Sequence, residues 1–101
     1  MFDKAKEMYQ LQKKAKEVQK ELKNTEVEAQ SSDGSVTAVF TADQKIKSID
    51  IKEEMLVEGK KRDLEDKLMK VITEALSRSQ AVAAEKTKGL MGEMGLNIPG
   101  L

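Results

Sequence analysis

The chain has 101 residues, of which 36% are charged and 3% aromatic, and its 18 Lys and Arg residues balance its 18 Asp and Glu residues. It contains no histidine and no cysteine. A chain of this length forms one domain at most. The missing residue types remove the commonest general base, the commonest metal ligand and all thiol chemistry. We therefore expect no enzyme activity, no catalytic or metal site, no cofactor and no small-molecule substrate.

The sequence also lacks the marks of a membrane protein or an exported protein. No apolar run approaches the roughly 20 residues that span a bilayer. Lysines interrupt the N-terminal segment where a signal peptide would have its apolar stretch. The absence of cysteine fits a reducing compartment, so the cytoplasm is the simplest expected location.

Charge is spread unevenly along the chain. Residues 1–23 have a net charge of +3, residues 24–59 of −5, and residues 60–101 of +2. The total of zero argues against a generally basic nucleic-acid binder, but the asymmetry places positive charge near both ends of the chain.

The first predicted element is a helix over residues 1–24. Its apolar residues follow steps of three and four: Met8, Leu11, Ala15, Val18 and Leu22. This heptad spacing is typical of a helix that packs along a narrow seam against another helix. Such a helix is roughly 35 Å long.

Three strands are predicted next, over residues 25–30, 35–41 and 46–51, because these stretches alternate or are rich in β-branched residues. Asp33-Gly34 marks the first turn, and both connections are too short for a crossover. The sequence therefore predicts an antiparallel meander. The apolar residues of the third strand, Ile46, Ile49 and Ile51, do not alternate regularly, so we expect them on both faces of the sheet.

An acidic connector over residues 52–59 leads to a second long helix, predicted from Lys60 to Lys88. Its apolar stripe is wider than that of the first helix, which favours contact with both the sheet and another helix. Residues 89–101 are rich in glycine and are predicted to form a flexible tail that folding does not require. The expected organisation is one α-β-β-β-α domain over residues 1–88 and a tail over 89–101.

This order of elements predicts an α+β fold: a long helix, a three-stranded antiparallel meander and a second long helix. A meander of this size covers little apolar surface. We therefore expect the helical stripes to need a second copy of the chain.

Lysines gather on one side of the first helix. Lys6, Lys13 and Lys20 lie directly opposite the apolar seam, and Lys16 and Lys23 lie beside them. Cations about 10 Å apart along a rigid helix match the requirement for following a phosphate backbone. The alternative is a solvated face that keeps a coiled coil soluble.

A second basic group, Lys60-Lys61-Arg62, begins the second helix. Cations there oppose the helix dipole, which indicates a candidate anion site. The alternative is that the acidic residues that follow, Asp63, Glu65 and Asp66, neutralise the group locally.

Several short stretches resemble the YbaB/EbfC family of bacterial nucleoid-associated proteins, in an order that spans nearly the whole chain. They are Gly34-Ser35-Val36, Ile49-Asp50-Ile51, Leu64-Glu65-Asp66, Ala75-Leu76 and the ending Gly95-Leu96-Asn97-Ile98-Pro99-Gly100. The resemblance implies an intertwined, tweezer-like homodimer that binds double-stranded DNA in the nucleoid with little sequence preference, and no known catalysis.

Two functions follow as hypotheses. The first is a homodimer that binds DNA through lysine–phosphate contacts, for which the candidate residues are Lys6, Lys13, Lys16, Lys20, Lys23, Lys60, Lys61 and Arg62. The second is a structural or adaptor module, a helical dimer that docks a protein partner.

Overall fold

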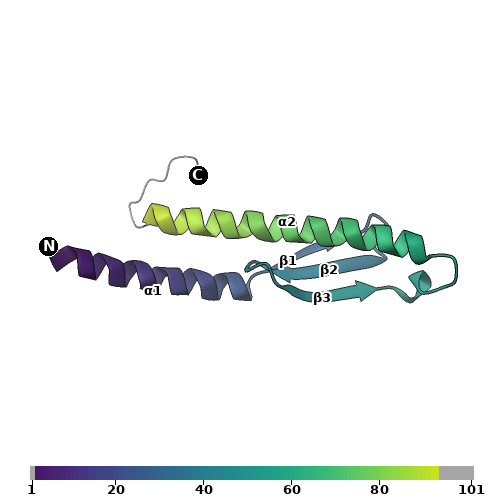
Figure 1. The fold of residues 1–101 in the computed structure, drawn as a ribbon, viewed down its shortest axis with the longest axis horizontal. Helices are drawn as coiled ribbons and strands as arrows, with labels where there is room; N and C mark the ends of the chain where they lie inside the picture. The colour runs from purple at the N-terminus through teal and green to yellow at the C-terminus, as the bar shows by residue number, and fades with distance from the viewer. Residues whose placement is uncertain (1, 94–101) are drawn as a thin grey trace.

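The computed structural model describes the backbone of residues 2–93 and the side chains of residues 4–92. The elements in chain order are α1 (Phe2–Asn24), β1 (Glu26–Gln30), β2 (Val36–Thr41), β3 (Ile46–Ile51), a short 3₁₀ turn η1 (Glu53–Met55) and α2 (Lys61–Glu93). Figure 1 shows an elongated molecule in which the sheet lies under one half of α2, and α1 runs beside the other half. The predicted α+β class and the predicted order of elements are confirmed.

The three strands form an antiparallel sheet in the order β1-β2-β3. The register shifts between Val39, which pairs with Ser48, and Phe40, which pairs with Ile46, so that Lys47 is an extra residue in β3. Such a bulge changes the alternation of the strand that contains it. The prediction that the isoleucines of β3 fall on both faces was therefore wrong. Ile46, Ile49 and Ile51 pair with Phe40, Ala38 and Val36 and share their face of the sheet.

The core lies between this face of the sheet and α2. Its buried residues are Ala29, Val36, Ala38, Phe40, Val71 and Ala75. The alanines let α2 approach β1 and β2 closely. β3 is covered less well, because Ile46 is 51% exposed and Ile49 is 41% exposed.

The remaining half of α2 pairs with α1 in antiparallel orientation, and we call this pair the arm (Figure 1). Leu11, Ala15 and Val18 of α1 are half-buried, and Leu90 of α2 is 6% exposed. The apolar stripe of the first helix was expected to need a second copy of the chain. Instead, α2 of the same chain covers part of it.

The second helix continues to Glu93, five residues beyond its predicted end at Lys88. Gly89 and Gly92 lie inside the helix, although a helical glycine costs about 1 kcal/mol relative to alanine. Burial of Leu90 offsets this cost. Residues 94–101 of the predicted tail lie outside the described residues.

The base of the arm is tied to the turn between β2 and β3. The backbone N–H of Ala42 donates to the carbonyl oxygen of Leu22 at 3.0 Å and to that of Thr25 at 2.8 Å. From α2, the Ser79 hydroxyl donates to the carbonyl oxygen of Thr41 at 2.7 Å. Ala42 and Ser79 are fully buried. These contacts fix the direction in which the arm leaves the sheet.

The turn between β1 and β2 is held to α2 by an ion pair. Lys67 Nζ lies 2.7 Å from Asp33 Oδ2 and 3.0 Å from Asp63 Oδ2. The other carboxylate oxygen of Asp33 accepts hydrogen bonds from the Ser35 hydroxyl at 2.7 Å and from the Ser31 hydroxyl at 2.8 Å. Lys67 and these serines hold the pKa of Asp33 well below its ordinary value, and the two carboxylates raise the pKa of Lys67.

Replacing Asp33 with asparagine should make stability less dependent on pH. A lowered folded-state pKa gives stability that is complete above the unfolded-state pKa, about 3.9, and is lost as pH falls further. The pair is exposed, so the effect is small. We expect the native chain to melt a few degrees above Asp33→Asn at pH 7, and the gap to close below about pH 4. Thermal melts followed by circular dichroism from pH 7 to 2 measure this, and a gap that stays constant with pH would contradict it.

Candidate nucleic-acid interface

The predicted lysines of α1 lie on the side of the arm that faces away from α2. The side chains of Leu11, Ala15 and Val18 lie toward α2, so residues half a helical turn away point outward. All five predicted lysines are exposed: Lys6, Lys13, Lys16, Lys20 and Lys23.

No ion pair to a residue in the described part of the chain engages any of these five lysines. Other cations are held by carboxylates of the chain. Lys47 pairs with Glu26, and Lys86 Nζ lies 2.5 Å from Glu21 Oε1. The positive charge of the outward side of α1 is therefore not balanced by partners of its own.

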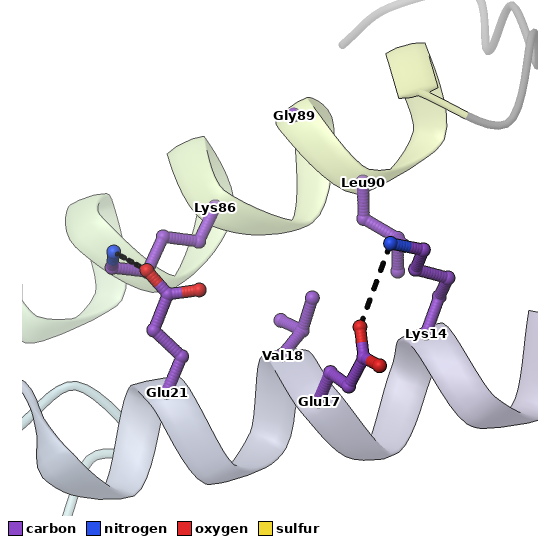
Figure 2. A pocket seen from close by; sticks show the side chains of 7 residues that line it. All are labelled: Lys14, Glu17, Val18, Glu21, Lys86, Gly89 and Leu90. Atoms are coloured by element: carbon purple, nitrogen blue, oxygen red, sulfur yellow. Dashed lines mark hydrogen bonds and ion pairs between the residues drawn. The ribbon is translucent and has the colours of Figure 1, made fainter.

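Two acidic residues of α1, Glu17 and Glu21, line a cavity between the two helices (Figure 2). Glu17 pairs with Lys14 at 3.5 Å, and Glu21 pairs with Lys86 across the cavity. Gly89 faces open space, which leaves this gap in the seam. Glu17 thus points toward the cavity and is paired with Lys14, so it does not neutralise the five outward lysines.

The outward side of α1 has six positions in steps of three and four. Five of them are the lysines predicted from the sequence, and the sixth is Tyr9, which falls between Lys6 and Lys13 and is 68% exposed. We call these six residues the basic row. The same spacing that located the lysines includes Tyr9.

The second basic group lies at the other end of the molecule. Lys60, Lys61 and Arg62 are exposed where α2 begins. Lys86 belongs to the arm. Along the axis of α2, Lys61 lies about 37 Å from Lys86. A single chain therefore does not join the two groups into one patch. Asp63, expected to neutralise the second group, is engaged by Lys67.

The face of the sheet that points away from α2 is acidic. Glu26, Glu28 and Asp50 are exposed there, opposite in direction to the buried Ala29 and Ala38. Lys47 pairs with Glu26 there, so the face keeps an excess of negative charge from Glu28 and Asp50, which disfavours a phosphate backbone.

No cluster of acidic side chains suited to a metal ion occurs in the described part of the chain. Within the same range, neither helix is long and apolar enough to cross a membrane.

Comparison with known families gives a match across almost the whole chain. A family model described as the YbaB/EbfC DNA-binding family matches residues 1–94. The chain belongs to the YbaB/EbfC family. The family assigned from sequence resemblance is thus confirmed.

Relatives in the YbaB/EbfC family resemble the chain along nearly its full length. A nucleoid-associated protein of Bradyrhizobium sp. is 37% identical over 91 residues, which cover 90% of this chain and 86% of that protein. A nucleoid-associated protein of Ligilactobacillus salivarius is 35% identical over 96 residues, covering 95% and 88%. An uncharacterized protein of Helicobacter pylori has a similar crystal structure, with a TM-score of 0.63 at 21% identity, covering 86% and 87% of the two chains. That last likeness supports the fold alone.

Shortening Leu90 should open the arm without unfolding the sheet. Leu90→Ala removes a buried side chain and leaves a cavity, which we expect to cost the arm about 2 kcal/mol, or roughly thirtyfold in amide exchange rate. Hydrogen exchange should therefore speed up in residues 11–22 and 83–93 and stay unchanged in β2. Met69→Ala, at a side chain that is 71% exposed, serves as the control. Unchanged exchange in both helices would mean that Leu90 does not hold the arm together.

Proposed function

We propose that this chain binds double-stranded DNA with little sequence preference, as a homodimer, through contacts between the lysines of the basic row and phosphates. The observation that carries the proposal is the row itself: five exposed lysines without ion-pair partners in the described chain, on one side of an arm that projects from the sheet. Membership of a DNA-binding family supports the same partner.

The chemistry of the row favours phosphate contact over base reading. Lysine is a compact point charge, and each lysine–phosphate contact releases counterions from the DNA. The row contains no Arg, Asn or Gln, the side chains that make paired hydrogen bonds to base edges. Phosphate contacts contribute affinity but carry no sequence information. Binding of this kind is independent of sequence and sensitive to salt.

The proposed dimer interface is the uncovered side of β3. β3 pairs only with β2 in the described chain, so its outer edge has unpaired backbone groups. Ile46 and Ile49 are exposed on the face that α2 covers elsewhere, and Leu56 and Val57 are 64% and 52% exposed in the connector that follows. A second copy would cover these apolar groups and leave both arms free to project, in a tweezer-like arrangement.

Lys60, Lys61 and Arg62 are proposed as a secondary DNA contact, because they are exposed but lie far along α2 from the basic row. The relatives are named as nucleoid-associated proteins, and we propose the nucleoid within the cytoplasm as the location of this chain. The role proposed is binding, not catalysis.

The adaptor hypothesis is favoured by one observation, the exposure of large apolar residues. Leu56, Val57 and Met69 are each more than half exposed. If a different protein covers them, the chain is an adaptor. The oligomeric state and DNA binding of the isolated chain together separate the two hypotheses.

Reversing two charges of the row should weaken DNA binding and its salt dependence. Lys13→Glu with Lys20→Glu leaves the seam intact, because both side chains point away from α2. We expect similar losses for unrelated duplex sequences. The slope of log affinity against log salt should also fall by roughly 0.9 per lost phosphate contact per subunit.

Lys52→Glu with Lys70→Glu makes the same change in net charge at exposed positions away from the arm, and serves as the control. If the two double variants lose the same DNA affinity, overall charge and not the position of the lysines explains the loss. If the native chain binds no duplex even at about 50 mM salt, where phosphate contacts are strongest, the DNA proposal fails.

Placing a charge on the uncovered face of β3 should separate the copies. We expect light scattering to give about twice the chain mass of 11.2 kDa for the native protein at micromolar concentration, and the mass of one chain for Ile49→Lys. Ser48→Lys changes the same strand on its other face and should remain dimeric. A native protein that runs as a single chain would contradict the proposed dimer.

A further inference from the structure

Tyr9 occupies the one position of the basic row that is not a lysine. It follows Lys6 by three residues and precedes Lys13 by four and Lys16 by seven, so all four share one side of the helix. The ring of Tyr9 is thus presented to solvent among cations.

Tyr9 contributes little to the fold of the described residues. The side chain is 68% exposed, and its hydroxyl has no hydrogen-bond partner among the described residues. A tyrosine in this position buries little ring surface and therefore contributes little to stability. Removing the ring should leave the helix and the arm in place.

We propose that Tyr9 is a direct, non-ionic DNA contact within the row, an inference that rests on the proposed function. The phenol hydroxyl would donate to a phosphate oxygen, as tyrosine does among the side chains that contact the DNA backbone. The ring would cover the adjoining deoxyribose, since one end of a tyrosine is polar and the other apolar. The row holds a single aromatic residue, so it offers no platform for successive unstacked bases, and the partner is duplex DNA.

This contact has a signature that lysine contacts lack. Removing a lysine–phosphate contact lowers the slope of log affinity against log salt (the salt slope), because fewer counterions are released on binding. Tyrosine is neutral and releases none. Tyr9→Ala should therefore lower affinity by a similar factor at every salt concentration and leave the slope unchanged.

The first test compares four proteins on one duplex of arbitrary sequence at several salt concentrations. A hydrogen bond to a charged group and the ring contact together predict about tenfold weaker binding for Tyr9→Ala. Tyr9→Phe, which loses the hydroxyl alone, should lie between Tyr9→Ala and the native chain. Gln10→Ala, at the next position, which is also exposed but lies outside the row, should bind as the native chain does.

The second test uses the native protein without labels. Tyr9 is the only tyrosine and the chain has no tryptophan, so its emission reports this one side chain. Adding the duplex should reduce quenching of that emission by acrylamide.

The outcomes separate the inference from the proposed function. If the duplex binds, but Tyr9→Ala has native affinity and quenching is unchanged, Tyr9 is outside the interface while DNA binding stands. A lower salt slope for Tyr9→Ala would mean that the residue acts by positioning lysines, which overturns a direct contact. Native affinity for Tyr9→Phe overturns the hydroxyl contact. If no duplex binds the native chain, the proposed function and this inference both fail.

Discussion

The direction of the arm depends on the backbone N–H of Ala42, which donates to the carbonyl oxygens of Leu22, in the last turn of α1, and of Thr25, the residue that follows α1. Ser79 of α2 donates to Thr41 in the same turn, so both helices are tied to the sheet at one buried place. Breaking a buried bond of this kind leaves a polar group unsatisfied, at a cost of about 1–3 kcal/mol. The arm therefore leaves the sheet at a fixed angle, and α1 meets the second half of α2 along its apolar side. The distribution of charged side chains on the outward side of the arm follows from that pairing.

Pairing of the helices also separates acidic from basic side chains on a chain whose formal net charge is zero. Glu17 and Glu21 lie toward α2, where Lys14 and Lys86 engage them. The side facing solvent is left with lysines that have no such partners in the described chain. Acidic side chains collect instead on the open face of the sheet, away from the arm's lysines. A neutral protein can thus present a locally basic surface, which is the electrostatic requirement for binding a phosphate backbone.

Most of the fold could be predicted from sequence, because heptad spacing, strand alternation and the Asp33-Gly34 turn are local signals. The lysine positions on α1 followed from the same helical spacing. Three features depend on tertiary contacts and could not be predicted. The bulge at Lys47 aligns the isoleucines of β3, burial of Leu90 extends α2 past Gly89, and the length of α2 keeps Lys61 far from the arm.

The central claim is that DNA lies against the outward side of α1, and the reactivity of individual lysines toward an acetylating reagent tests it most directly. Rates measured by mass spectrometry for the native protein, with and without a duplex of arbitrary sequence, report on every lysine at once. Slower acetylation of Lys6, Lys13, Lys16, Lys20 and Lys23, with unchanged rates at Lys52 and Lys70, is the predicted result. Protection confined to Lys60 and Lys61, with the lysines of α1 still fully reactive, would contradict the account.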